Sequence, residues 1–260
     1  MTVITRQEVT LRIYPPTVGI VTQAGVLMVL AATVGLGVVG WGVGAAFALV
    51  TWILLARALG RPEGHRWGPA DSVTLARLTM AGGVTALVAD SLGRPGPVPV
   101  LTGLAAVALL LDGVDGQVAR RTGTTSRLGA RFDMEADSAL VLVLSVFVAD
   151  TLGWWVLAIG AYRYIFVAMS WAAPWLRASL PPRLSRKVVA AMQGVVLVVA
   201  STDLIPKSSA AVCVGLSLVF LTWSFGADVR WLWKQQASAL HREPAEHTRA
   251  ARRREMASVG

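Results

Sequence analysis

Charged residues are scarce in this sequence. Aspartate, glutamate, lysine and arginine make up 15% of the 260 residues, whereas a soluble domain of this size carries about 25%. This shortage excludes an ordinary soluble domain, and 55% of the residues are hydrophobic. The apolar residues form long blocks, such as Val26–Val39 and Val98–Leu111. Because lipid offers the backbone no hydrogen-bond partners, such blocks indicate membrane-spanning helices, each needing about 20 mostly apolar residues.

Cysteine is almost absent, and acidic residues are fewer than basic ones. The single cysteine, Cys213, lies in an apolar run and cannot form an internal disulfide, so we expect it to pack. The net charge of +9 would suit a nucleic-acid partner. However, the arginines cluster at the ends of apolar blocks with few aromatic residues between them. This distribution favours a membrane topology signal and contact with anionic lipids, with no nucleic-acid partner.

The sequence predicts an all-α, polytopic transmembrane helix bundle with about eight spans. The expected spans are approximately 18–38, 41–59, 72–92, 97–116, 132–151, 154–173, 187–204 and 209–229. Connections rich in arginine alternate with connections that contain almost none. The positive-inside rule therefore predicts a multi-pass protein of the cell membrane, with both termini and the arginine-rich loops in the cytoplasm.

Four aspartates lie near the ends of two consecutive predicted spans. Asp112 and Asp115 are three residues apart, and Asp133 and Asp137 are four apart, so each pair shares one helix face. A short connection brings the two helices together in antiparallel fashion. Four converging carboxylates would repel one another inside a membrane, and a divalent cation relieves that repulsion. Oxygen-only ligands favour Mg²⁺ or Mn²⁺, although for any one aspartate a solvated helix end paired with arginine remains an alternative.

The stretch from Leu111 to Asp137 reads LDGVDGQVARRTGTTSRLGARFDMEAD. It resembles the motif of the CDP-alcohol phosphotransferase (CDP-alcohol phosphatidyltransferase) family, D-G-x2-A-R-x8-G-x3-D-x3-D. The resemblance covers about Pro69–Trp233, which would form a six-helix core. The residues that carry the motif are Asp112, Gly113, Asp115, Gly116, Ala119, Arg120, Gly129, Asp133 and Asp137.

The resemblance implies an enzyme with two divalent cations, Mg²⁺ or Mn²⁺. Asp112, Asp115, Asp133 and Asp137 would hold the cations, and Asp137 would also be the catalytic base. The acceptor hydroxyl would attack the phosphorus distal to cytidine, with release of CMP. A weaker match to P-N-x-x-T-x-x-R, with Asp71 in place of the asparagine, adds two residues to the CDP site. The implied CDP-binding residues are Gly113, Gly116, Ala119, Arg120, Gly129, Thr74 and Arg77.

A second group of polar residues is predicted to bind the acceptor. Its members are Arg163, inside an apolar span, and Ser185, Arg186, Lys187 and Arg230 near the ends of spans. Some family members carry K-x-K-T-x-x-Q here; this chain keeps Lys187 and Gln193, but Val189 and Ala190 replace the second lysine and the threonine. The acceptor therefore stays open. An ion pair for Arg163, and topology anchoring for Arg186 and Lys187, are alternatives.

We expect three parts: a leader and two-helix transmembrane hairpin (1–60), a six-helix CDP-alcohol phosphotransferase core (61–233) and a basic cytoplasmic tail (234–260). The predicted donor is CDP-diacylglycerol or a related CDP-alcohol, and the predicted acceptor is a polyol or polyol phosphate, such as inositol phosphate or glycerol phosphate. Gly40 and Gly44 have the spacing of a helix-packing face, which would serve either a homodimer or packing within the chain.

Two other functions remain as alternatives. A carboxylate-lined cation or proton transporter would place its charges near mid-membrane in two related repeats, but here they lie in one hairpin at one end. A catalytically inactive family member that serves as a membrane scaffold would not need the intact aspartates.

Overall fold

All the regular structure in the described residues is helical. The computed structural model describes residues 6–59, 69–122, 127–177, 184–202 and 204–257, and the side chains within 17–57, 71–113, 133–173, 175–176, 185–202 and 204–236. The helices are α1 (Arg6–Val34), α2 (Val38–Leu59), α3 (Pro69–Ser91), α4 (Val98–Thr122), α5 (Arg127–Leu152), α6 (Leu157–Ala172), α7 (Leu184–Ala200) and α8 (Lys207–Ala257), with short 3₁₀ turns η1 (Trp154–Val156) and η2 (Pro174–Arg177). The prediction of an all-α bundle is confirmed.

The helices of the described chain match the predicted spans one for one. Five of them are long and apolar enough to cross a membrane, by length and composition: Thr17–Val34, Val38–Arg57, Asp71–Ser91, Trp154–Ala172 and Lys207–Gln236. The other three helices, α4, α5 and α7, do not meet these criteria of length and composition. The described apolar part of α4 ends at Gly113, α5 carries several acidic residues, and α7 has 17 residues. The chain is a polytopic membrane protein.

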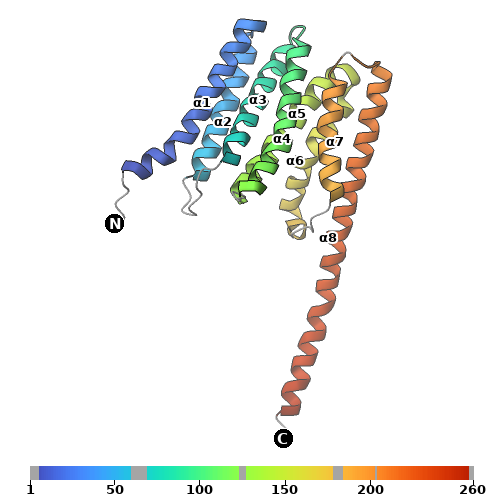
Figure 1. Ribbon diagram of the computed structural model, residues 1–260. Coiled ribbons are helices and arrows are strands. Elements are labelled where there is room, and N and C mark those ends of the chain that lie inside the picture. The colour runs from blue at the N-terminus through green and yellow to red at the C-terminus, as the bar shows by residue number, and fades with distance from the viewer. Residues whose placement is uncertain (1–5, 60–68, 123–126, 178–183, 203, 258–260) are drawn as a thin grey trace.

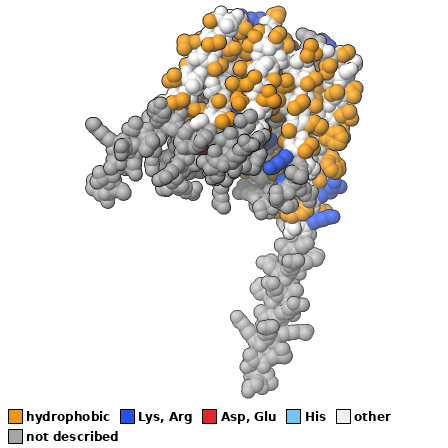
Figure 2. Space-filling model, viewed as in Figure 1, with side chains coloured by type: hydrophobic (Ala, Val, Ile, Leu, Met, Phe, Trp, Pro, Cys, Tyr) orange, Lys and Arg blue, Asp and Glu red, His pale blue; other side chains and the backbone are white. Residues whose placement is uncertain are grey.

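Helix α3 lies at the centre of the first half of the bundle. It packs against α1, α2, α4 and α5, while α5 also packs on α6, and α7 packs on α8. The helices stand side by side, and the beginning of α1 and the end of α8 lie at the same end of the bundle (Figure 1). Leu101, Leu144 and Leu197 are fully buried between helices. Many large apolar side chains of the described residues are exposed, and Figure 2 shows apolar side chains over the described part of one face, as in a protein that faces lipid rather than water.

The N-terminal hairpin of α1 and α2 is fixed to α3 by polar contacts and small residues. Gly35, with φ +72°, ends α1 and donates its N–H to the Ala31 carbonyl at 3.1 Å. The N–H of Gly37 donates to Asp90 Oδ2 at 3.1 Å. A Cβ on Gly40 would lie 3.0 Å from the Ala86 carbonyl oxygen, and one on Gly44 would lie 3.1 Å from Ala86 Cβ. These two glycines therefore serve close packing within the chain.

Two helices extend beyond the spans expected from hydropathy. Helix α1 begins at Arg6 and includes Pro15 and Pro16, and Figure 1 shows that it bends in its first half. Proline removes a helical hydrogen bond and is the usual cause of such a bend. Helix α8 continues to Ala257, well past the apolar segment.

Candidate active site

Three aspartates from two helices come together near one end of the bundle. One carboxylate oxygen from each of Asp112, Asp133 and Asp137 lies within 4.8 Å of the other two, and all three residues are partly buried. Asp112 is ten residues before the end of α4, and Asp133 is six residues after the start of α5. At 1.5 Å per residue, these positions are about 15 and 9 Å inside the helix ends. Three of the four aspartates therefore converge as predicted, and the side chain of the fourth, Asp115, is outside the described ones.

Arg77 of α3 lies at the centre of this cluster, and its side chain is only 3% exposed. Its Nη1 is 2.9 Å from Asp112 Oδ1 and also donates to Asp133 Oδ1, while Nη2 pairs with Asp137 Oδ1. Thr74, one turn earlier on α3, is also buried. The structure thus joins the weaker motif on α3 directly to the aspartate motif on α4 and α5.

The donor set suits a hard divalent cation. All three ligand groups are carboxylate oxygens, which Mg²⁺ and Mn²⁺ prefer. Two oxygens bound to one Mg²⁺ at about 2.1 Å can be at most about 4.2 Å apart. The upper limit of 4.8 Å between the cluster oxygens is therefore close to what one ion requires. The three carboxylates attract cations, and in the described structure the guanidinium of Arg77 supplies one positive charge among them.

For most of the remaining motif residues, the structure describes the backbone but not the side chain. Asp115, Gly116, Ala119 and Arg120 lie within α4, and Gly129 lies within α5, but their side chains are outside the described ones. Gly113 is exposed, and a Cβ there would have no described atom within 4 Å. In the motif segment D-G-x2-A-R, two residues separate the glycine from the alanine. Gly116 has this spacing from Ala119, so Asp115 and Gly116 fill the first two positions of the segment. Asp112 and Gly113 lie one helical turn earlier.

The predicted acceptor residue Arg163 makes an ion pair. Its Nη2 donates to Glu135 Oε1 at 2.5 Å, and its Nη1 lies 3.6 Å from the Met134 sulfur. Glu135 is two residues from both Asp133 and Asp137, so it points to another face of α5, about 200° around the helix. The structure therefore does not bring Arg163 to the aspartate face.

The other predicted acceptor residues lie on α7 and α8. Arg186 Nη1 is 3.6 Å from Asp228 Oδ2, and Asp228 is buried. Ser185 and Lys187 are exposed on either side of Arg186. The Nε of Arg230 donates to the Gly226 carbonyl of its own helix at 3.3 Å. The structure thus brings Arg186 to α8.

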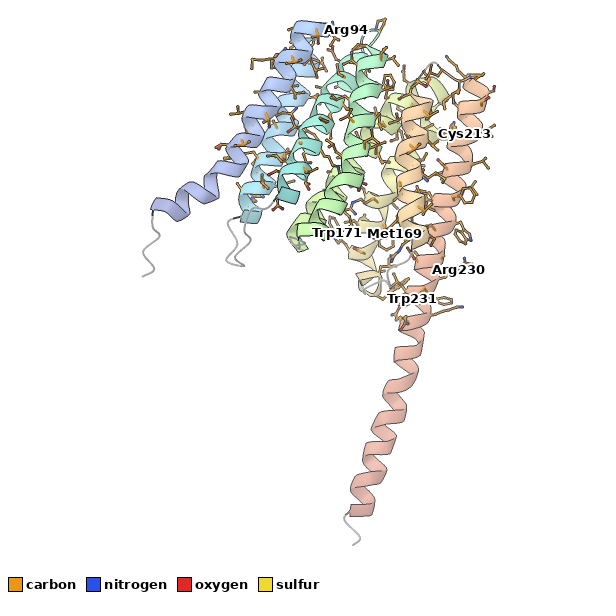
Figure 3. All side chains as sticks on the ribbon, viewed as in Figure 1. Arg94, Met169, Trp171, Cys213, Arg230 and Trp231 are labelled. Atoms are coloured by element: carbon orange, nitrogen blue, oxygen red, sulfur yellow. The ribbon has the colours of Figure 1, made fainter. Side chains whose placement is uncertain are left out.

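Arg230 lies near one end of the bundle, at the level of two tryptophans. Figure 3 shows it beside Trp231, at the end of the bundle where Trp171 also lies. Of these two tryptophans Trp171 is exposed, and exposed tryptophan near the end of a membrane span is typical of a membrane–water interface.

Sequence reasoning missed the partners that hold these residues. Glu135 and Asp228 were not singled out, although an acidic residue within or beside an apolar run is itself a signal of pairing. Gln193 is buried, and its Nε2 donates to the Ser217 carbonyl at 2.9 Å, while Ser217 Oγ donates to Gln193 Oε1 at 3.0 Å. This residue, part of the expected acceptor pattern, instead links α7 to α8.

One comparison with known proteins is informative. A family model described as CDP-alcohol phosphatidyltransferase matches residues 67–224, more than half of the chain. The match includes α3 to α7, most of the apolar part of α8 and the motif aspartates Asp112, Asp115, Asp133 and Asp137, and it leaves out α1 and α2. Neither a curated protein nor a solved structure shows significant similarity to the chain.

Proposed function

We propose that this chain, which belongs to the CDP-alcohol phosphatidyltransferase family, transfers a phosphatidyl group from CDP-diacylglycerol to a polyol or polyol phosphate. Family membership implies transfer of a substituted phosphoryl group from a CDP-alcohol to an alcohol within a membrane. The observation that best supports the proposal is the convergence of Asp112, Asp133 and Asp137 at one end of a transmembrane bundle. A water-soluble CDP group on a lipid anchor would meet the protein at this depth.

In the proposed reaction, Asp137 accepts the proton of the acceptor hydroxyl. The hydroxyl oxygen forms a bond to the phosphorus distal to cytidine, the bond from that phosphorus to the bridging oxygen breaks, and CMP leaves. Two divalent cations, Mg²⁺ or Mn²⁺, would be held by Asp112, Asp115, Asp133 and Asp137 and would supply positive charge for the diphosphate and for the attacking and leaving oxygens. A positioned general base typically contributes about 10²–10⁴-fold to the rate.

The same site would hold the CDP group of the donor. Arg77 on α3 contacts the three aspartates, and the buried Thr74 lies one turn before it. The exposed Gly113 leaves room for a ligand near the α4 backbone. We assign the same role to Gly116, Ala119, Arg120 and Gly129 from the motif. For the acceptor we favour three cationic residues and one neighbouring hydroxyl: Arg186, Lys187, Arg230 and Ser185. An acceptor role for Arg163 would require it to leave Glu135.

The proposed arrangement in the cell follows from the distribution of charge. Both termini and the aspartate cluster would face the cytoplasm, since the positive-inside rule assigns the arginine-rich connections to that side. Residues 1–60, 61–233 and 234–260 would form the hairpin, the catalytic core and the basic tail. A homodimer would have to form through faces other than Gly40 and Gly44, since both pack within the chain.

The experiment is a transfer assay with the purified full-length chain. Protein, CDP-diacylglycerol and Mg²⁺ or Mn²⁺ are incubated with a panel of alcohols that includes inositol phosphate and glycerol phosphate, and CMP is measured. We expect acceptor-dependent CMP release with one class of polyol, and none with Asp133→Asn. Absence of CMP release with every acceptor would contradict the proposal.

A further inference from the structure

Arg77 is the least expected member of the aspartate cluster. Sequence reasoning assigned it to the donor's CDP group, but its guanidinium lies among carboxylates expected to bind metal, with the side chain 3% exposed. A buried charge in a membrane protein needs a partner of opposite sign. In the described structure the three aspartates are that partner for Arg77, and Arg77 is the cation that gathers them.

A divalent cation and this guanidinium compete for the same oxygens. Nη1 contacts the Oδ1 atoms of Asp112 and Asp133, and Nη2 contacts Oδ1 of Asp137. Positive charges about 4 Å apart repel each other at a partly buried site such as this one, where Arg77 is buried and the three aspartates are half-exposed. Tight metal binding therefore requires Arg77 to withdraw from at least some of these oxygens.

A displaced guanidinium cannot remain unpaired at a buried position. The partner that enters this site in the proposed reaction is the donor's diphosphate, and the planar fork of arginine suits phosphate oxygens. Arg77 is eight residues into α3, about 12 Å from that helix end, which is the depth of Asp112 and Asp133. A diphosphate held at the aspartates would therefore lie within reach of the same side chain.

We propose that Arg77 is the internal counter-cation of this site and couples divalent-cation binding to donor binding. Without metal, it bridges the aspartates of α4 and α5. When metal and donor bind together, the aspartates exchange the guanidinium for metal, and the guanidinium exchanges the aspartates for the diphosphate. This inference rests on the proposed function, and it predicts that each ligand strengthens the binding of the other, because such coupling is reciprocal.

The test measures Mn²⁺ affinity by electron paramagnetic resonance, with the full-length protein in detergent, with and without CDP. The variants are Arg77→Met, Arg77→Lys and the control Arg94→Met. Arg94 also pairs with an aspartate, Asp90, but lies beyond the other end of α3. We expect Arg77→Met to bind Mn²⁺ about tenfold or more tightly than the wild type without CDP, because the competitor is gone. Arg94→Met should match the wild type.

CDP should strengthen Mn²⁺ binding in the wild type by about 5–150-fold and in Arg77→Met by a smaller factor. Arg77→Lys, which keeps a cation but loses the fork, should fall between them and covers the case in which Arg77→Met does not fold. Weaker Mn²⁺ binding in either variant would overturn the proposal, because it would mean that Arg77 holds the aspartates in place for the metal. Unchanged affinity without CDP would also overturn it and leave Arg77 as a diphosphate ligand alone.

The failure of this inference differs from failure of the proposed function. If wild-type protein binds Mn²⁺ no better than Asp112→Asn, the metal site and the role of Arg77 both fail. If the wild type binds Mn²⁺ and releases CMP but Arg77→Met binds no more tightly, only the coupling is wrong.

Discussion

Arg163 of α6 and Glu135 of α5 form an ion pair on a face of α5 away from Asp133 and Asp137. Arg163 therefore links α6 to α5, the helix that carries Asp133 and Asp137. We expect Arg163→Met and Glu135→Gln to lower the melting temperature in detergent similarly, and the double variant to add little. Since both side chains are partly exposed, the coupling between them should be about 0.2–1 kcal/mol.

Kinetics separate this role from acceptor binding. If Arg163 acts only through Glu135, both single variants should change the acceptor KM by the same small factor. A large rise in acceptor KM for Arg163→Met, with Glu135→Gln near the wild type, would instead make Arg163 an acceptor ligand.

Asp137→Asn should lose turnover while keeping much of its donor binding. Asparagine cannot accept the hydroxyl proton, so kcat should fall by about 10²–10⁴-fold. The other aspartates still offer oxygens for metal, so the affinity for CDP-diacylglycerol should fall less. Binding and CMP release are measured beside Asp112→Asn, which should lose both. A wild-type rate for Asp137→Asn would show that the proton leaves through another group.

Lys187→Ala should raise the KM for the acceptor more than the KM for CDP-diacylglycerol. Lys187 is exposed near the start of α7, beside Arg186 and at the aspartate end of the bundle. Loss of ground-state binding to one substrate appears mainly in that substrate's KM. The matched control is Lys207→Ala, since Lys207 is an exposed lysine at the opposite end, where α8 begins. Equal effects of the two variants would place the acceptor elsewhere.

Gln193→Leu should reduce stability without a selective change in either KM. The substitution removes the amide that bonds Ser217 of α8 and leaves a buried carbonyl without that partner, which costs about 1–3 kcal/mol. The control is Ser201→Ala, because Ser201 is a buried residue next to α7 whose hydroxyl donates to Val198 within its own turn. A selective rise in acceptor KM with unchanged stability would restore Gln193 to the acceptor site.

The sequence predicted the helices well because long apolar blocks are a direct signal of membrane spans. It missed the first residues of α1 and the last turns of α8, where polar residues continue a helix and hydropathy gives no signal. The spacing of the aspartates predicted their convergence, since residues three or four apart share a helix face.

The place of Arg77 could not be predicted in this way. Its partners Asp133 and Asp137 are 56 and 60 residues away in the chain. No local spacing reports a contact between α3 and α5, and the packing of the two helices decides it. The same holds for Arg186 and Asp228, which are joined by the packing of α7 on α8.

The central claim is that a divalent cation held by these aspartates is required for phosphatidyl transfer. The most direct measurement is CMP release from CDP-diacylglycerol by the full-length protein, first in excess chelator and then during titration with Mg²⁺ or Mn²⁺. We predict no release in chelator, recovery on adding either cation, and no recovery for Asp112→Asn, Asp115→Asn or Asp133→Asn. Full CMP release in excess chelator would contradict the account.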